Sequence, residues 1–357
     1  MRAEKARAQV ALVKGDDRYA NITQALELIA GDVAVGQKHS ILIKPNFVST
    51  TRQLAATHVE AVRAVLEFLK SRTNAEIVIA EGAALADTFD GYRNFGYQAL
   101  ARDYHVTLVD LNREAWVPLI VYDRDLRPFA VRVARTVVES DYRISVGPPK
   151  THDVVVVTLS LKNMVMGSVI REETRGPGNA RVLSSLGSVI PQSVKRSPLY
   201  ESMKSRILGP FGHSDKFAMH QGYPALNLNL YLVGRYVYPH LAVIDGFEAM
   251  EGDGPTFGDP VELRLAIASA DFLAADTVAT RIMGFDVNDV GYLHYCRRAG
   301  LGTGDLARIA ILGAPLAESL RPFKPHSTIA AQRAWRTPEV EECLAHILNR
   351  ATRVAAP

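Results

Sequence analysis

The residues best suited to chemistry lie within a segment that is otherwise apolar. Lys150 and His152 follow two prolines, and Lys162-Asn163 comes ten residues after the histidine. The flanking residues, Ile144 to Val146 and Val154 to Val157, have the composition of a protein core. Polar groups inside a core must be hydrogen-bonded or paired with opposite charge. We therefore predict that this segment carries the chemistry, although its residues do not name a reaction.

Two lysines beside a histidine would make a local positive pocket and lower the pKa of all three groups. Such a pocket suits an anionic substrate: Lys150 and Lys162 would bind the anion, and a neutral His152 would transfer a proton. Asn163 would orient the substrate or donate to a developing oxyanion. The alternative is a satisfied buried network that only holds two lobes together. We favour function, because buried lysine is seldom structural.

The local structure of this segment is also predicted from its residue types. Val154 to Val157 is expected to be extended, and Thr158 to Met166 to form a short helix. Thr158 would be the N-cap of this helix and Gly167 its C-terminal stop. Lys162 would then lie one turn beyond Thr158, with its side chain projecting back toward the preceding turn. Thr158 is therefore counted among the predicted binding residues.

Polar residues also follow other short apolar runs. Because the carboxyl ends of parallel strands meet at one edge of a sheet, we expect these residues to gather beside the Lys150 segment. Lys44 and Asn46, just past a buried strand, are predicted to bind the substrate with Glu81 and Gly82. The runs and the residues after them are Ile41 to Ile43 with Lys44-Pro45-Asn46, Ile77 to Ala80 with Glu81-Gly82, Val106 to Val109 with Asp110-Leu111-Asn112, and Leu241 to Ile244 with Asp245-Gly246.

The segment from Asp245 to Pro255 contains three glycines and four acidic residues. Glycine permits positive φ angles and a close approach of the backbone to a ligand. Backbone N–H groups could cradle an anion here, or the carboxylates could hold a hard cation. An ordinary surface turn explains the glycines equally well. Asp245 is a predicted catalytic residue, and Glu251, Gly252 and Gly254 are predicted binding residues.

Alternation of apolar runs with amphipathic stretches predicts the fold. Thr57 to Lys70 places its apolar residues mostly along one stripe, and Asp271 to Met283 begins with a plausible N-cap aspartate. Alternation of strands with such helices indicates an α/β protein. We predict a mainly parallel, Rossmann-like sheet with helices on both faces and an inserted basic loop region.

Two segments stand apart from this alternation. Within an α/β domain spanning residues 1–330, residues 171–220 are predicted to form an insertion or lid, because 171–216 is rich in Gly, Ser, Pro and Arg. Flexible surface is the alternative interpretation. His220 would join the site when a lid closes. Residues 331–357 are predicted to form a C-terminal amphipathic helix capped by Thr337 with Pro338 at its first position, which would dock on the body or mediate a dimer.

Composition narrows the classes of function. The net charge of +3 comes from basic residues spread along the chain, so no nucleic-acid partner is expected. Cys296 and Cys343 are the only cysteines. We therefore expect neither an iron–sulfur cluster within the chain nor disulfide bonds. No apolar run is long enough for a membrane span, and residues 1–9 lack a signal-peptide core, so we expect a cytoplasmic protein without a membrane partner.

Common catalytic motifs are missing from the sequence. It contains no H-E-x-x-H, G-x-S-x-G, Rossmann G-x-G-x-x-G or Walker motif. These absences argue against the usual zinc protease, serine hydrolase, dinucleotide and P-loop classes. The cofactor is therefore left unknown, with a divalent metal as one option.

The ordered series of strand-end residues resembles the family named domain of unknown function 362 (DUF362). The resemblance covers about Val10 to Gly313. Many members carry a ferredoxin-like segment with cysteine clusters, for which a redox role is inferred, and this chain lacks those cysteines. A strand-end histidine followed by a lysine and a glycine is also similar to the nickel-pincer lactate racemases. The residues that carry the DUF362 resemblance are Lys44-Pro45-Asn46, Glu81-Gly82, Asp110-Leu111-Asn112, Lys150-Thr151-His152, Thr158, Lys162-Asn163, Gly167, Asp245-Gly246, Glu251 to Pro255 and Met283 to Asp286.

Two hypotheses follow. The first is an enzyme that uses lysine, histidine and asparagine at the carboxyl edge of the sheet for acid–base chemistry on a small anionic metabolite, of an isomerase or racemase type or as a partner-assisted oxidoreductase. The second is a non-catalytic ligand-binding or scaffold protein, or a redox protein that works with a separate iron–sulfur partner. A homodimer or an electron-carrier partner is compatible with either hypothesis.

Overall fold

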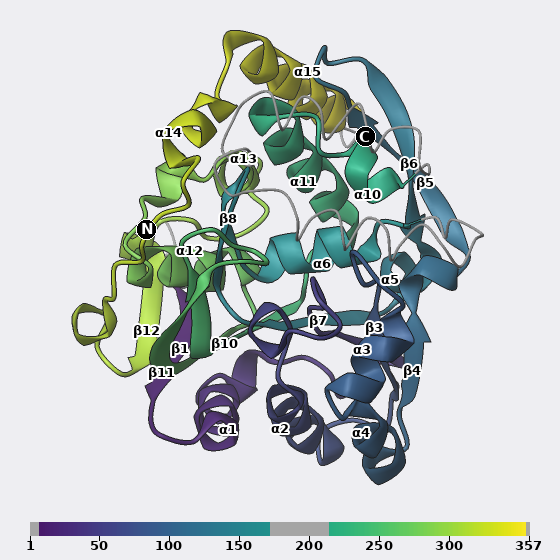
Figure 1. Ribbon diagram of the computed structural model, residues 1–357, viewed down its shortest axis with the longest axis vertical. Helices are drawn as coiled ribbons and strands as arrows, with labels where there is room; N and C mark the ends of the chain where they lie inside the picture. Colours follow the sequence, from purple (N-terminus) through teal and green to yellow (C-terminus); the bar gives the residue numbers. More distant parts are fainter. Residues whose placement is uncertain (1–6, 172–213, 355–357) are drawn as a thin grey trace, which may run out of the picture.

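The computed structural model describes residues 7–171 and 214–354, with side chains described as far as residue 349. Most of the predicted insertion or lid, residues 172–213, lies outside the described residues. The described chain folds around one large sheet with helices packed against it (Figure 1).

The sheet has the strand order β12-β1-β11-β10-β7-β2-β3-β4. A short β8–β9 ribbon extends it, because β8 pairs with both β10 and β9. The strands of this sheet are β1 (Ala8–Lys14), β2 (Ser40–Lys44), β3 (Glu76–Glu81), β4 (Thr107–Asp110), β7 (Tyr142–Gly147), β8 (Lys150–His152), β9 (Val156–Thr158), β10 (Leu241–Glu251), β11 (Asp259–Ser269) and β12 (Ile309–Gly313).

The five apolar runs identified in the sequence form one parallel half of this sheet. Strands β10, β7, β2, β3 and β4 are neighbours in that order, and every pairing among them is parallel. Only β11, which lies between β1 and β10, runs antiparallel to both of its neighbours. The prediction of a mainly parallel α/β sheet is confirmed.

Two cores lie on opposite faces of the sheet because strand side chains alternate between faces. Ile41 and Ile43 of β2 join one buried cluster, whereas Leu42 between them joins the other. The first face is covered by α1 (Arg18–Leu28), α2 (Val59–Lys70), α3 (Thr88–Asn94) and α4 (Tyr97–Tyr104). The second is covered by α6 (Ser160–Ser168), α11 (Tyr223–Val237), α12 (Phe272–Ile282) and α13 (Gly291–Arg298). Helices on both faces agree with the sequence prediction.

The two predicted long helices form with caps close to those expected. Helix α12 is capped by Asp271, whose Oδ1 accepts a hydrogen bond from the Ala274 amide at 3.1 Å. Helix α2, predicted over Thr57 to Lys70, spans Val59–Lys70 and is capped by His58. The Thr57 hydroxyl donates to the Val146 carbonyl at 2.8 Å, which ties the start of α2 to β7.

A hairpin that the sequence reading did not predict lies apart from the main sheet. Strands β5 (Trp116–Tyr122) and β6 (Pro128–Ala134) pair only with each other among the named strands, and α5 (Arg135–Glu139) leads back to β7. Asn229 of α11 bonds both the amide and the carbonyl of Tyr122, at 2.8 and 2.7 Å. The hairpin is therefore anchored to the second face.

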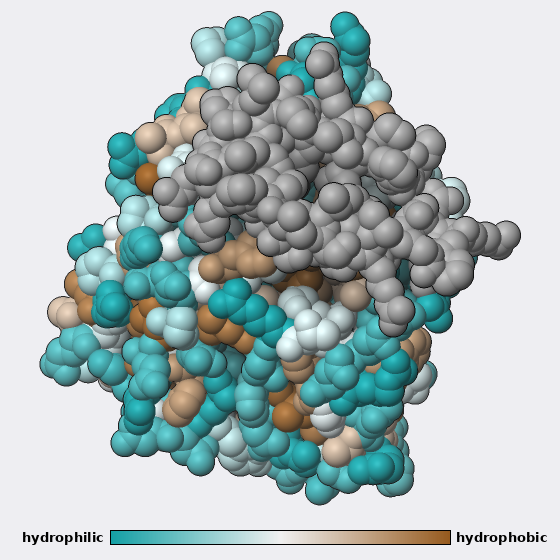
Figure 2. Space-filling model, viewed as in Figure 1, coloured by the Kyte–Doolittle hydropathy of each residue, from teal (hydrophilic) through white to brown (hydrophobic). Residues whose placement is uncertain are grey.

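Two short helices remain to be placed in the chain: α10 (Asp215–Ala218) comes before α11, and α14 (Ile329–Gln332) comes before the C-terminal helix α15 (Pro338–Val354). It begins with Pro338 after Thr337, as predicted, and buries Val340 and Leu344 in the core of the second face. It thus docks on the body. Figure 2 shows mainly hydrophilic side chains over the described part of one face, with apolar side chains in scattered patches. No helix within the described ranges is long and apolar enough to cross a membrane.

Candidate functional site

The β8–β9 ribbon presents three of the predicted site residues together. Lys150 pairs with Thr158 and His152 with Val156 in the antiparallel register. Alternation places Lys150, His152 and Thr158 on one face of the ribbon. Thr151 points to the other face, where its hydroxyl donates to the Gly252 carbonyl at 2.8 Å. Because Lys150 and His152 are two residues apart on a strand, their side chains point to the same face of the ribbon.

Helix α6 carries Lys162 and Asn163 and lies between the sheet and α11 (Figure 1). Its predicted cap and stop are wrong: the helix begins at Ser160, and Gly167 lies inside it. The capping oxygens belong to Asp276 of α12, which accepts the Ser160 and Leu161 amides at 2.9 and 3.1 Å. Burial raises the pKa of Asp276 to about 7. A cap supplied from a distant helix leaves no local sequence signal.

A buried ion pair joins the ends of β2 and β3. The Lys44 ammonium contacts the Glu81 carboxylate and donates to the Asn163 Oδ1 at 2.9 Å and the Pro45 carbonyl at 2.8 Å. The other Glu81 oxygen accepts the Phe47 amide at 3.0 Å. Burial lowers the pKa of Lys44, and Glu81 opposes that shift. Both residues were predicted to bind the substrate, but here the Lys44 ammonium and the Glu81 carboxylate pair with each other.

Gly167 makes room for this pair. A Cβ atom at position 167 would lie 2.1 Å from the Lys44 Nζ and 2.7 Å from the Glu81 Oε2. Gly82 is close as well, since its Cβ would meet the Gly167 carbonyl at 2.5 Å. These two glycines allow α6 to approach the sheet edge directly over the ion pair.

Two asparagines connect the ion pair to the Lys150 segment. The Asn163 Oδ1 accepts from both Lys44 and the Asn46 Nδ2, the latter at 3.1 Å. The Asn46 Oδ1 in turn accepts from the Lys150 ammonium, which also donates to the Ala55 carbonyl at 3.3 Å. Burial, followed by the charge of Lys162, lowers the pKa of Lys150 to about 7. Five of the predicted residues, Lys44, Glu81, Asn163, Asn46 and Lys150, therefore form one continuous buried hydrogen-bond network.

Lys162 is buried beside this network but does not belong to it. Its side chain is buried, with a residue exposure of 6%, yet its amine donates no hydrogen bond to any residue that the structure describes. Burial lowers its pKa to about 8, with Asp153 opposing the shift and Lys44 adding to it. The Thr158 hydroxyl is likewise buried and has no hydrogen-bond partner within the described residues. Two uncommitted polar groups thus adjoin Lys150.

His152 is held as a neutral ring. Its Nδ1 accepts the Val154 and Val155 amides at 3.0 and 3.3 Å, so the ring proton lies on Nε2. The Asp153 carboxylate also lies 3.0 Å from Nδ1, but two aligned amide donors leave no proton there for it to accept. Burial first, then the charges of Lys162, His220 and His326, lower the pKa of His152 well below its ordinary range. The ring therefore presents an N–H donor.

Two more basic side chains, Lys216 and His326, complete the cluster and were not singled out from the sequence. Lys216 of α10 is buried and donates to the Gly82 carbonyl, and burial lowers its pKa to about 7. His326, in the segment before α14, acts electrostatically on His152. His220, predicted from its position after the insertion, is exposed and donates from Nδ1 to the Lys216 carbonyl at 2.7 Å. No spacing rule links Lys216 or His326 to His152, so only the fold identifies these two residues.

Asp245 lies in a different environment from the lysines. Its carboxylate accepts from the Arg18 Nε at 3.1 Å, and burial raises its pKa. The expected loop after it does not form, because β10 continues to Glu251 by pairing with β11 through Asp259. Asp245 is buried against α1, and its carboxylate contacts Arg18 rather than the lysines of the cluster. Its predicted catalytic role therefore gains no support from the geometry.

The residues from Glu251 to Gly254 hold the segment that contains Lys324 in place. The Glu251 carboxylate accepts the Lys324 amide at 2.9 Å, and the Gly252 amide donates to the Lys324 carbonyl at 2.8 Å. Gly254 packs on Thr151, since a Cβ there would lie 2.3 Å from the Thr151 carbonyl. Their amides and carboxylates are thus used to fasten residues near His326. Within the described ranges, no group of three or more His, Cys, Asp and Glu side chains could hold a metal ion.

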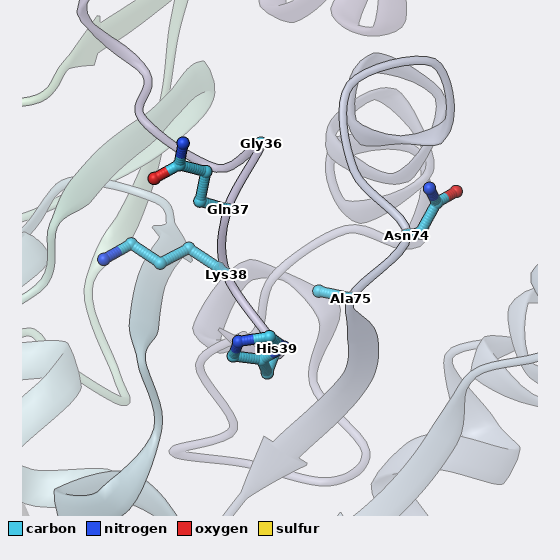
Figure 3. A pocket seen from close by; sticks show the side chains of 6 residues that line it. All are labelled: Gly36, Gln37, Lys38, His39, Asn74 and Ala75. Atoms are coloured by element: carbon cyan, nitrogen blue, oxygen red, sulfur yellow. The ribbon is translucent and has the colours of Figure 1, made fainter.

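A separate hollow lies at the opposite edge of the sheet. It is lined by Gly36, Gln37, Lys38, His39, Asn74 and Ala75, at the start of β2 and β3 (Figure 3). Ligands of open α/β sheets bind beyond the carboxyl ends of the strands. This hollow lies at the amino ends, so we assign the candidate site to the buried cluster.

The fold is that of an α/β protein with a cluster of buried basic side chains at the carboxyl edge of its sheet. The family model "Domain of unknown function (DUF362)" matches residues 41–281, more than half of the chain. The chain belongs to the DUF362 family, as its strand-end residues predicted.

Two individual proteins are also similar. A thylakoid-associated protein of Synechocystis sp. is 23% identical over 303 residues, which are 84% of this chain and 76% of that protein. The lactate racemase apoprotein of Thermoanaerobacterium thermosaccharolyticum has 13% sequence identity and a TM-score of 0.42. That alignment covers 79% of this chain, which spans 58% of the racemase.

Proposed function

We propose that this protein is an enzyme that acts on a small anionic metabolite by acid–base chemistry. The observation that carries the proposal is the imbalance of buried charge. Lys44, Lys150, Lys162 and Lys216 are all buried, and Glu81 is the carboxylate in direct contact with one of them. Buried charge is costly unless it is paired, so an anion that enters the cluster would supply the missing charge.

Each residue has a distinct role in the proposed chemistry. Lys150, positioned by Asn46 and Ala55, binds the anion in its protonated form, which a nearby negative charge favours. His152 donates from Nε2 to a developing oxyanion, because Nδ1 is occupied by backbone amides. The proton-transfer role moves to Lys162, whose pKa of about 8 suits exchange near neutral pH. Asn163 fixes the geometry between the ion pair and the site.

Binding and turnover are tested separately. Calorimetric titration with pyruvate, oxalate and phosphate measures binding to the wild type and to Lys150→Met. We expect at least one carboxylate to bind, with affinity reduced about tenfold or more in the variant, since a charged hydrogen bond is lost. NMR in D₂O then follows exchange of carbon-bound protons in the ligand. Failure of every anion to bind would overturn the proposal, whereas binding without any exchange would favour a ligand-binding protein.

We propose a cytoplasmic location because the chain has only two cysteines. The Synechocystis relative bears a name that associates it with thylakoids. Fractionation of cells that express the tagged chain tests the location. Recovery in the membrane pellet after a high-salt wash would contradict the proposal.

A further inference from the structure

The four buried lysines of the site differ in what their amines contact. The Lys44 amine is paired with Glu81, and the Lys216 amine donates to the Gly82 carbonyl. The Lys150 amine donates to Asn46 and Ala55. The Lys162 amine donates no hydrogen bond to the residues that the structure describes, although its side chain is buried. Lys162 therefore presents its nitrogen to whatever enters the cluster.

We propose that Lys162 is a nucleophile that forms an imine with a carbonyl group of the substrate. The substrate class is then an oxo acid, in which a carboxylate lies beside a ketone or aldehyde carbon. This inference rests on the proposed function, because the carboxylate is the anion that the cluster binds. Lysine amines desolvated next to another cation are the usual imine formers in proteins.

The surrounding residues fit the two ends of an oxo acid. Lys150 supplies a positioned amine whose protonated form binds the carboxylate. Thr158, paired with Lys150 across the ribbon, supplies a hydroxyl that has no partner among the described residues. The His152 Nε2–H can donate to the carbonyl oxygen. With a pKa of about 8, roughly a tenth of the Lys162 amine is unprotonated at pH 7. That fraction is enough for attack, because protonation equilibrates rapidly.

The step balances without an added oxidant or reductant. The lone pair of the neutral Lys162 nitrogen attacks the carbonyl carbon, and the C=O π electrons move to oxygen. The nitrogen then loses one proton as the oxygen gains one, which restores the nitrogen lone pair. The resulting carbinolamine loses its hydroxyl group as water after a second protonation. The nitrogen lone pair forms the C=N bond of a protonated imine. Overall, one ammonium and one carbonyl give one iminium and one water.

Reductive trapping tests the inference. The full-length protein is incubated with pyruvate and sodium cyanoborohydride, and tryptic peptides are analysed by mass spectrometry. We expect the reduced adduct on Lys162, with loss of labelling at that site in Lys162→Arg. Lys70→Arg is the matched control, since Lys70 is the last residue of α2 and its side chain is 67% exposed. The melting temperature of each variant, followed by circular dichroism, shows whether it folds.

The outcomes separate this inference from the proposed function. Labelling confined to Lys162 supports the imine. Binding of pyruvate by calorimetry, in the absence of any trapped adduct on Lys162, would overturn the imine and leave the anion site intact. Equal labelling of many exposed lysines would also overturn it, because that pattern reflects unselective amine chemistry. If pyruvate neither binds nor labels the protein, the imine and the oxo-acid substrate class are both overturned, and the binding of oxalate and phosphate then decides the anion site.

Discussion

Two ends of the buried lysine cluster differ in whether the charge of the lysine is compensated. At the paired end, Lys44 meets Glu81, and the Glu81 carboxylate also accepts the Phe47 amide. At the open end, Lys162 and the Thr158 hydroxyl have no partner among the described residues. The two ends share burial and residue type, so contact with a counter-charge is what separates them.

This difference determines how each buried lysine affects the stability of the native state. A lysine with a carboxylate partner contributes to the native state only while that partner is present, because removing one member leaves an uncompensated charge. A lysine without a partner destabilises the native state until a ligand arrives. We therefore expect substitutions at the two ends to change the free energy of unfolding in opposite directions.

Removal of the paired lysine should have the largest effect. Lys44→Met leaves the Glu81 carboxylate buried without its ammonium, which we expect to lower the free energy of unfolding by about 3–5 kcal/mol. Urea titration followed by circular dichroism measures the change. The double variant Lys44→Met/Glu81→Gln removes both charges and should recover part of the loss. A double variant that is less stable than Lys44→Met would contradict the pairing argument.

Filling the space above the ion pair should have the next largest effect. Gly167→Ala places a methyl group 2.1 Å from the Lys44 Nζ, so the pair or helix α6 must shift. We expect a loss of about 1–3 kcal/mol in the same urea titration. Gly31→Ala is the control, because a Cβ there meets no atom within 4 Å. Equal stability of the two alanine variants would show that α6 has room to move.

Removal of the open-end lysine should stabilise the protein. The pKa of Lys162 is lowered from 10.5 to about 8 on folding, so the unfolded chain binds more protons between these values. The resulting penalty is fully present below pH 8 and disappears as the pH rises toward 10.5. At pH 7, Lys162→Met should therefore be more stable than the wild type by about 1–2 kcal/mol, with the gain shrinking at high pH. Unfolding titrations at pH 7, 8 and 10 measure it, and a destabilised variant at pH 7 would count against an open end.

The smallest effect is expected for the threonine hydroxyl. Thr158→Val removes a buried hydroxyl that has no partner within the described residues, so stability should change by less than about 0.5 kcal/mol while anion affinity falls several-fold. Thr57→Val is the matched control. Its hydroxyl accepts the Asn46 amide and donates to the Val146 carbonyl, both at 2.8 Å, so the same change should cost about 1–3 kcal/mol. Equal losses in both variants would refute the contrast.

The strand ends were predictable from the sequence because their signal is local. A short apolar run followed by Lys44 or by Glu81 marks a buried strand and the polar residue beyond it. Parallel pairing then places Lys44 opposite Ser145 and Glu81 opposite Asp110 at the same edge. The family resemblance followed from the same ordered residues and is confirmed by the family model.

Other features of the site depend on contacts between distant residues. The cap of α6 comes from Asp276, 116 positions away from Ser160, so Thr158 was wrongly predicted to provide it. Asp245 follows a strand as Lys44 does, yet Arg18 of α1 holds its carboxylate on the other side of the sheet. Hydropathy patterns record which residues are buried but not which buried groups meet.

By itself, the sequence determined the parallel sheet, the polar residues at its carboxyl edge and the family, because each follows from short-range pattern and order. Only the tertiary structure decided which lysine is paired and which is open. Lys44 and Lys162 are both buried lysines near the same edge, and residue type does not distinguish them. The difference arises from whether β3 brings a carboxylate within contact distance, which it does for Lys44 alone among the four buried lysines of the site in the described structure.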